Sequence, residues 1–577
     1  MVSDARALAT WLALRDDAAL ASTLAARGVS PTVNWHDFFD AAEGLLEQGS
    51  LDRALTRLAR PELLAVAAAA SPSEPPATDG VGSRLALIDD TGRPFGPVAD
   101  RLAATRSAHP DAFAPIPVPS PPGPADARSA AAAAEQAFTS AGSLADVLLA
   151  CLHSAITRTG AGPVSAADRK RLTDAGAITH ADDLEDLLAS AAASGLAIAH
   201  DREWVVTTAG EQWLETSTAG RWATVVEGFR ASLPEGLRTP DGGFLAPGVW
   251  ADAYPLDADW SERARRLRRL GVLWGLFGAS SDAEFPWTVA LRTGAPADAG
   301  TMTPHLPTEI DRVYLQADLT AIAPGPLAPA LDLRLRSIAL RESRAQASTY
   351  RFTPESLGAG MTEGETAGSV RSFLSQLSLT GIPQPLDYLI ESTALRHGLV
   401  RVRSEESSGR TRVESADAGL LDTIAIDQSL RPLGLVDDNG ALSSRVARDA
   451  VYWTLADARY PVVALDDNGT PESVHRRTAT TQSEPSPTPT RTYSRLIQTL
   501  RSGHGTGGEE GWLGRELEQA VRARSEIIVV VKMPDGTERS LTLEAAGLGG
   551  GRLRGRDRAA DIERTLPVSS IVSVRPA

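Results

Sequence analysis

Lysines are the first residues to examine for phosphate chemistry, because a nucleotide-hydrolysing P-loop places one lysine after glycine and before serine or threonine. The 577-residue chain has two, Lys170 and Lys532. Lys170 lies between two arginines, and Lys532 lies between a valine and a methionine. Neither context fits a P-loop, and both leave little room for a Schiff-base lysine. The sequence therefore excludes a Walker-type ATPase motor within this chain.

Nucleophile and metal signatures are missing from the sequence as well. It has no Gly-x-Ser-x-Gly elbow and no His-Glu-x-x-His, and its nine histidines are scattered. Cys151, the single cysteine, lies in the apolar run 144–156, which favours a buried, inert thiol. Asp437–Gly440 and Asp466–Gly469 resemble calcium loops but lack the glutamate at the twelfth loop position, so we expect hairpin turns. We therefore predict no enzyme activity, no catalytic residue, no cofactor and no metal.

Arginines carry the remaining candidate chemistry, which is contact with nucleic-acid phosphates. The net charge of −16 argues against a protein that coats nucleic acid indiscriminately. Residues 491–577 hold 14 Arg and Lys against 11 Asp and Glu, a net of +3, which leaves −19 elsewhere. Two arginine-rich stretches stand out, and they predict these candidate DNA-binding residues: Arg552, Arg554, Arg556, Arg558, Arg564, Arg263, Arg266 and Arg269.

Each stretch also has an interpretation that does not involve DNA. In a strand, Arg552, Arg554 and Arg556 would share one face, which suits a single nucleic-acid strand. The same arginines could instead pair with neighbouring carboxylates and do nothing else. The stretch 261–270 predicts the most basic helix of the chain, and its alternative is a solvated face that pairs with nearby acids.

The elements that position these residues begin with an Ala/Leu-rich helical region, followed by a proline-rich linker. After the linker, the order is an apolar helix (144–156), a short basic helix (165–174), a helix that begins at Asp182, and a tight hairpin around Asp201. Three helices and a hairpin in this order predict a winged helix. Such a module either contacts DNA or binds protein, and the four acidic residues in 182–186 are a poor surface for phosphates.

The second half predicts an α/β unit and a small barrel. Strands at 313–316, 349–352 and 399–403 and a helix from Pro385 predict one unit with its own core. After a Pro/Gly-rich linker with a short helix, a helix and several short strands predict an SH3-like or Sm-like barrel. The fold class is thus α+β and multi-domain. The predicted domains are 1–105 (helical), 106–127 (linker), 128–230 (winged helix), 231–310 (connecting region with the basic helix), 311–475 (α/β), 476–512 (linker with a short helix) and 513–577 (barrel).

The α/β segment resembles a known family. The stretches VYLQADLTAIAPGPLAPAL (313–331), STYRFTPESL (348–357) and PQPLDYLIE (383–391) resemble the N-terminal domain of XPB-type DNA helicases, which also occurs in stand-alone helicase-associated proteins of actinobacteria. The resemblance extends in order from about residue 4 to residue 577 and is dense over 311–403. It implies an accessory role in DNA repair or transcription, with single-stranded or forked DNA as ligand and a separate helicase or nuclease as partner.

The closing segment resembles a WYL-type barrel, a family of Sm-like sensors that bind nucleic acid or small ligands. The Trp-Tyr-Leu triplet itself is absent, and Ile527, Ile528 and Val529 stand near its place. Arg564 matches the position of a functional arginine in that family. The alternative function is a protein-interaction scaffold or small-ligand sensor without direct DNA binding. No apolar run is long enough for a membrane span and the start does not resemble a secretory signal, so we expect a cytoplasmic protein.

Overall fold

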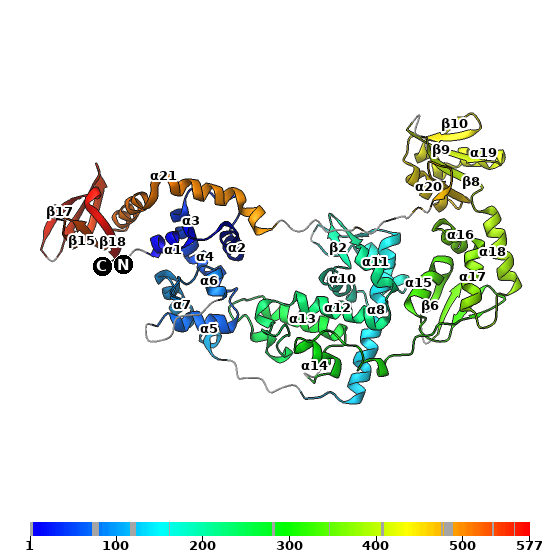
Figure 1. Cartoon of the computed structure of the whole chain (residues 1–577), viewed down its shortest axis with the longest axis horizontal. Helices are drawn as coiled ribbons and strands as arrows, with labels where there is room; N and C mark the ends of the chain where they lie inside the picture. Colours follow the sequence, from blue (N-terminus) through cyan, green and yellow to red (C-terminus); the bar gives the residue numbers. More distant parts are fainter. Residues whose placement is uncertain are drawn as a thin grey trace.

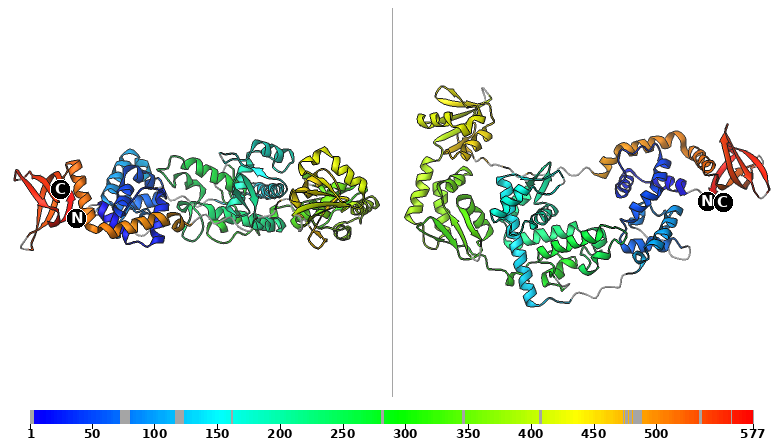
Figure 2. Two further views of the ribbon diagram at one scale, coloured as in Figure 1. Left: turned by 90° about the horizontal axis from the view of Figure 1, so that it is seen from above. Right: turned by 180° about the vertical axis from the view of Figure 1, so that it is seen from behind.

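The computed structural model describes residues 4–71, 80–115, 123–160, 162–279, 283–344, 347–405, 409–472, 474, 477, 480, 488–533, 536–558 and 560–576. The side chains of residues 81, 344, 471, 504–511 and 576 are not described. Five hydrophobic cores form from the described residues. They follow one another along an elongated, arched molecule of mixed α and β structure (Figure 1). Figure 2 shows the same units in a row when viewed from above. No helix of the described chain is long and apolar enough to cross a membrane.

The N-terminal bundle is a group of short helices. Asp16 and Asp37 cap the helices that follow them by accepting hydrogen bonds from free backbone amides. A short hairpin forms around Asp89–Gly92, with Ile88 paired to Pro94. The elements of the bundle are α1 Asp4–Ala13, α2 Asp17–Arg27, α3 Phe38–Leu46, α4 Gln48–Leu55, α5 Arg60–Ala69, α6 Val81–Arg84, α7 Gly96–Ala108 and η1 Pro110–Phe113. Residues 116–122 of the predicted proline-rich linker lie outside the described residues.

The helical body follows and has one core that runs from Ala130 to Met302, across the predicted boundary at residue 230. Within it, β1, β3 and β2 form a three-stranded sheet in that order. The elements are α8 Ala127–His153, β1 Ile156–Thr157, α9 Ala166–Asp174, α10 Asp183–Ala193, β2 Ala197–His200, β3 Glu203–Val206, α11 Thr208–Glu215, α12 Thr218–Ser232, η2 Glu235–Leu237, η3 Pro247–Asp252, α13 Trp260–Leu273, α14 Pro286–Arg292 and η4 Thr303–His305.

Residues 313–474 form two α/β units, each with its own core. The four-stranded unit has the sheet order β4-β5-β7-β6. Its elements are β4 Tyr314–Leu315, β5 Thr320–Ala323, α15 Pro329–Ile338, β6 Leu340–Arg344, β7 Ser348–Arg351, α16 Pro354–Thr362, α17 Ala367–Leu377 and α18 Gln384–Arg396. The six-stranded unit has the order β10-β11-β9-β8-β12-β13. Its elements are β8 Val400–Glu405, β9 Arg410–Ser415, α19 Ala418–Ile426, η5 Gln428–Leu433, β10 Val436–Asp438, β11 Ala441–Ser444, α20 Arg448–Asp457, β12 Val462–Leu465 and β13 Pro471–Glu472.

One part of the sequence prediction for this region is wrong. The expected strand at 399–403 does not join the core that precedes it, because Val400 and Val402 of β8 pack in the second core. Alternation shows that a strand is half-buried, but it does not show which core the strand joins. The two expected hairpin turns are confirmed. Asn439 and Gly440 both have positive φ between β10 and β11, as a two-residue hairpin loop requires.

The C-terminal sheet has five antiparallel strands in the order β17-β16-β15-β14-β18. The several short strands expected after the linker are confirmed. One face of the sheet packs on the preceding helix, α21, through a core that includes Leu517 and Val529. The elements are α21 Pro489–Ala523, β14 Glu526–Lys532, β15 Glu538–Gly549, β16 Arg552–Asp557, β17 Ile562–Pro567, η6 Val568–Ser570 and β18 Ile571–Pro576.

The sequence predicted a linker with a short helix at 476–512. Most of this segment is instead part of α21, which is continuous for 35 residues through the glycine-rich stretch. Tyr493 and Leu500 at its start belong to the core of the N-terminal bundle. Gly503 shows why glycine is needed there, since a Cβ at this position would lie 2.0 Å from the carbonyl oxygen of His36. α21 therefore fixes the C-terminal sheet to the N-terminal bundle, as Figure 1 shows.

Candidate nucleic-acid interface

The exposed face of β16 holds three of the eight candidate arginines. Arg552, Arg554 and Arg556 are exposed, whereas Leu553 and Gly555 between them are buried. This alternation follows from the pleat, because the buried side chains face α21. The predicted placement of the three arginines on one face is therefore confirmed, and we call this surface the outer face of the C-terminal sheet.

Arg552 and Arg554 have no carboxylate opposite them. Arg554 lies between Gly547 of β15 and Thr565 of β17, and Arg552 lies opposite Gly549. Within the described part of the chain, neither guanidinium makes an ion pair. No atom lies within 4 Å of where a Cβ would stand on either glycine, so the surface beside the arginines is low and open. These two cations are available to a phosphate.

The next two arginines are paired. Arg556 makes an ion pair with Asp561 at 2.5 Å, and Arg558 makes one with Glu544 at 2.9 Å. The hydrogen bond from Arg558 lowers the pKa of Glu544 below its ordinary value. Both pairs are exposed to solvent, and they neutralise this end of the outer face.

Arg564 lies on the opposite face from Arg554. It stands across from Gly555, a buried residue of β16, and its Nε lies 3.0 Å from Asp557. The guanidinium is half-buried beside the core. The structure therefore does not bring Arg564 together with the arginines of the outer face.

The arginines of α13 lie far from the C-terminal sheet, in the helical body (Figure 1). Arg266 and Arg269 both contact the carboxylate of Asp186 on α10, at 3.4 and 2.8 Å. Asp186 is 5% exposed, so its charge is compensated by these two guanidinium groups. The hydrogen bond to Asp186 raises the pKa of Arg269 above its ordinary value. Arg263 pairs with Asp257, so all three α13 candidates already have carboxylate partners.

α10 is the helix that a DNA-binding winged helix would place in the major groove. Most of its residues are buried, and Ser190 accepts a hydrogen bond from the indole of the buried Trp274 at 2.8 Å. Arg266 and Arg269 cover its acidic first turn. A helix covered in this way does not present the exposed face that a groove requires.

Residues with possible catalytic chemistry lie in unreactive surroundings. The Nζ of Lys170 is 2.7 Å from Asp174 on the surface of α9. Cys151 is buried, its Sγ–H donates to the carbonyl of Trp204 at 3.0 Å, and burial raises the pKa of the thiol to about 11. In the part of the chain that the structure describes, His, Cys, Asp and Glu side chains form no group of three that could hold a metal.

A comparison with protein families finds a match to part of this chain. Residues 313–438 match a family model described as the helicase conserved C-terminal domain. The chain carries a helicase-related domain. The match runs from the start of the four-stranded unit to β10 of the six-stranded unit, over the segment in which the sequence resembles an XPB-type domain. No curated protein matches the chain.

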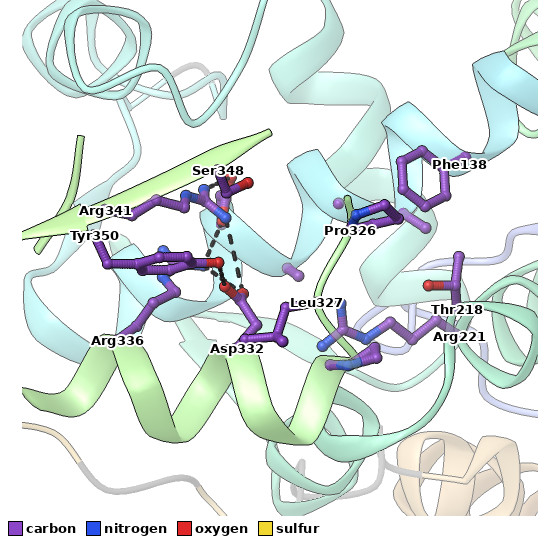
Figure 3. Close-up of a pocket in the computed structure, with 15 residues that line it drawn as sticks. Phe138, Thr218, Arg221, Pro326, Leu327, Asp332, Arg336, Arg341, Ser348 and Tyr350 are labelled. Atoms are coloured by element: carbon purple, nitrogen blue, oxygen red, sulfur yellow. Dashed lines mark hydrogen bonds and ion pairs between the residues drawn. The ribbon is translucent and has the colours of Figure 1, made fainter. Parts of the chain in front are cut away.

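One charged cluster of the helicase-related domain was missed by the sequence analysis. The carboxylate of Asp146, on α8 of the helical body, accepts hydrogen bonds from Arg336 of α15 at 2.6 Å and Arg341 of β6 at 2.5 Å. Asp332 lies beside them and accepts a hydrogen bond from the hydroxyl of Tyr350 at 2.6 Å (Figure 3). A lone acidic residue inside the apolar run 144–156 was the only sequence signal for this cluster.

Proposed function

We propose that this chain is a non-catalytic, helicase-related accessory protein that binds single-stranded DNA through the outer face of its C-terminal sheet. The observation that carries the proposal is the exposed pair Arg552 and Arg554, which has no carboxylate partner among the described residues. Successive outward residues of a strand are about 7 Å apart. That spacing is close to the distance between consecutive phosphates of one nucleic-acid strand, and an arginine can pair with each.

The finer assignments of the proposal rest on topology and on the sequence resemblance. A helix followed by five strands in the order β18-β14-β15-β16-β17 supports an Sm-like or SH3-like barrel of the WYL type. The order α8, α9, α10 and the β2–β3 hairpin, with β1 paired to β3, supports a winged helix. The resemblance to the N-terminal domain of XPB-type helicases supports a role in DNA repair or transcription. A chain without a P-loop would need a separate helicase or nuclease for catalysis.

A second function has support of its own. The net charge of −16, the covered α10 and the paired arginines of α13 all favour a scaffold that binds proteins or a small effector. In this alternative the winged helix is an interaction module, and Arg552 and Arg554 are solvated surface residues.

Equilibrium binding to labelled oligonucleotides separates the two functions. We expect the full chain to bind single-stranded or forked DNA at low salt more tightly than duplex. Arg552→Ala with Arg554→Ala should weaken that binding roughly tenfold, because two exposed ion pairs contribute about 0.7 kcal/mol each. A full chain that binds none of the three DNA forms at low salt would establish the scaffold instead.

The control is a variant that removes one positive charge elsewhere, and it is compared with Arg554→Ala alone. Arg522→Ala fits this purpose, because Arg522 is 81% exposed on α21 and has a loose 3.8 Å pair with Glu518. We expect this variant to bind like the wild type. Equal weakening by Arg522→Ala would mean that net charge, and not the outer face, determines the binding.

A further inference from the structure

The helical body and the four-stranded unit meet at a joint in which Leu333 of α15 packs against the core of the helical body, beside a cluster of charged side chains. Each has its own hydrophobic core, and residues of α8, α12, α15, β6 and β7 line a small, partly open cavity of about 100 Å³ between them. Buried and half-buried guanidinium and carboxylate groups line part of this cavity, together with Thr218 and Ser348 (Figure 3). Interfaces that are polar and incompletely packed separate more readily than apolar ones. Opening of this joint would expose these charged groups to water.

A single carboxylate of the helical body enters an arginine pair of the helicase-related domain. Asp146 is 4% exposed, and each of its two oxygens accepts a hydrogen bond from a different arginine, Arg336 or Arg341. Guanidinium groups pair with phosphate oxygens as they do with carboxylate oxygens, so two that converge on one carboxylate can also converge on a phosphate. The carboxylate comes from a separate unit, so opening the joint removes it from the pair.

The arginine pair does not depend on Asp146 for its position. Asp332, on the same α15, lies 3.6 Å from Arg336 and 3.8 Å from Arg341. Tyr350 donates to Asp332, which fixes that carboxylate in turn. Burial disfavours the charged form of Arg336, but the two carboxylates outweigh burial and its pKa lies above the ordinary value. With Asp146 withdrawn, three charged groups remain with a net charge of +1.

We propose that Arg336 and Arg341 form a phosphate site for single-stranded nucleic acid, and that Asp146 occupies this site as an internal competitor while the joint is closed. The backbone phosphate and the carboxylate compete for the same two guanidinium groups. Nucleic acid therefore binds there only when the joint is open, and its binding shifts the joint toward the open state. The site is separate from the outer face of the C-terminal sheet.

The test uses the full chain in which Arg552→Ala and Arg554→Ala have already removed the proposed outer-face contacts, so that the two proposals fail independently. Asp146→Asn is added, and binding of a labelled oligothymidylate is measured together with hydrogen exchange of the α8 and α15 amides. We expect faster exchange at both helices. We also expect affinity to rise roughly tenfold, because the internal competitor has lost its charge. A further Arg341→Ala should abolish the gain.

The matched control breaks an ion pair at a different joint. Glu235→Gln removes the 2.6 Å pair with Arg84 of the N-terminal bundle and should change neither the binding nor the exchange of α8. The proposal is overturned if Asp146→Asn leaves the affinity unchanged, whether or not the joint opens. It is also overturned if the gain survives Arg341→Ala or appears equally with Glu235→Gln. Circular dichroism of each variant shows whether it is folded, and Asp146→Ser serves as the second variant if Asp146→Asn is not.

Discussion

The two arginine-rich stretches, in α13 and in β16, are similar in composition and opposite in surroundings. In α13, Arg266 and Arg269 contact Asp186, which lies about eighty residues earlier in the chain. In β16, Arg552 and Arg554 face glycine, threonine and proline across the strand pairs. A cluster of arginines therefore lacks ion-pair partners only where the elements packed beside it carry no acidic residues.

Leu553 gives the sharpest contrast within β16, because it lies between Arg552 and Arg554 in sequence and on the other face of the sheet. Leu553→Ala should destabilise the C-terminal sheet by about 3 kcal/mol, since it removes a fully buried side chain. Arg554→Ala should change stability by less than about 0.5 kcal/mol. Native-state hydrogen exchange of the β15 and β16 amides measures both. Equal effects of the two variants would show that the alternation is wrong.

Asp186 tests the other side of the comparison. Asp186→Ala should destabilise the helical body by about 2 kcal/mol, because the buried carboxylate makes charged hydrogen bonds with α13. Hydrogen exchange of the α10 and α13 amides is the measurement. Asp182→Ala is the control, since Asp182 is fully exposed and its nearest arginine, Arg169, is 4.0 Å away. If Asp182→Ala lowers the stability of the helical body as much as Asp186→Ala does, Asp186 is not the carboxylate that holds the arginines of α13.

A third basic cluster lies in α9, where Arg171 pairs with Asp168. The contribution of this pair to stability depends on pH. Burial alone would raise the pKa of Asp168, but hydrogen bonds from Thr157, Arg171 and Ser165 outweigh it and lower this pKa to about 2. The folded-state pKa is below the ordinary 3.8, so Asp168 stabilises the fold fully above pH 3.8 and loses this effect as the pH falls through about 2. We expect Asp168→Asn to cost about 1 kcal/mol at neutral pH after solvent screening.

Thermal unfolding of the wild type and Asp168→Asn across acidic pH checks this expectation. The two curves should converge as the pH approaches 2. A difference that is the same at pH 7 and at acidic pH would mean that the carboxylate charge is not what stabilises α9.

The sequence predicted what depends on local pattern. Alternation placed Arg552 and Arg554 on one face of a strand, and the stretch Asp437–Gly440 predicted a hairpin turn. The local pattern did not predict that α21 continues through its glycine-rich stretch. The glycine at 503 is needed because the helix there passes close to His36, which is distant in the sequence. The Asp146 cluster was missed for a similar cause, since its arginine partners lie 190 or more residues away along the chain.

Arg552 and Arg554 should have the smallest effect on stability, and they are the residues that carry the proposed function. The number of phosphate contacts that they make shows whether the outer face of the C-terminal sheet binds DNA. The affinity of the full chain for single-stranded DNA is measured over a salt series, for the wild type and for Arg552→Ala with Arg554→Ala. Loss of two phosphate contacts should make the slope of log affinity against log salt shallower by about 1.4. The parallel variant, Arg266→Ala with Arg269→Ala, should leave the slope unchanged. An unchanged slope in the β16 variant, or a shallower slope in the α13 variant instead, would contradict DNA binding through the outer face of the C-terminal sheet.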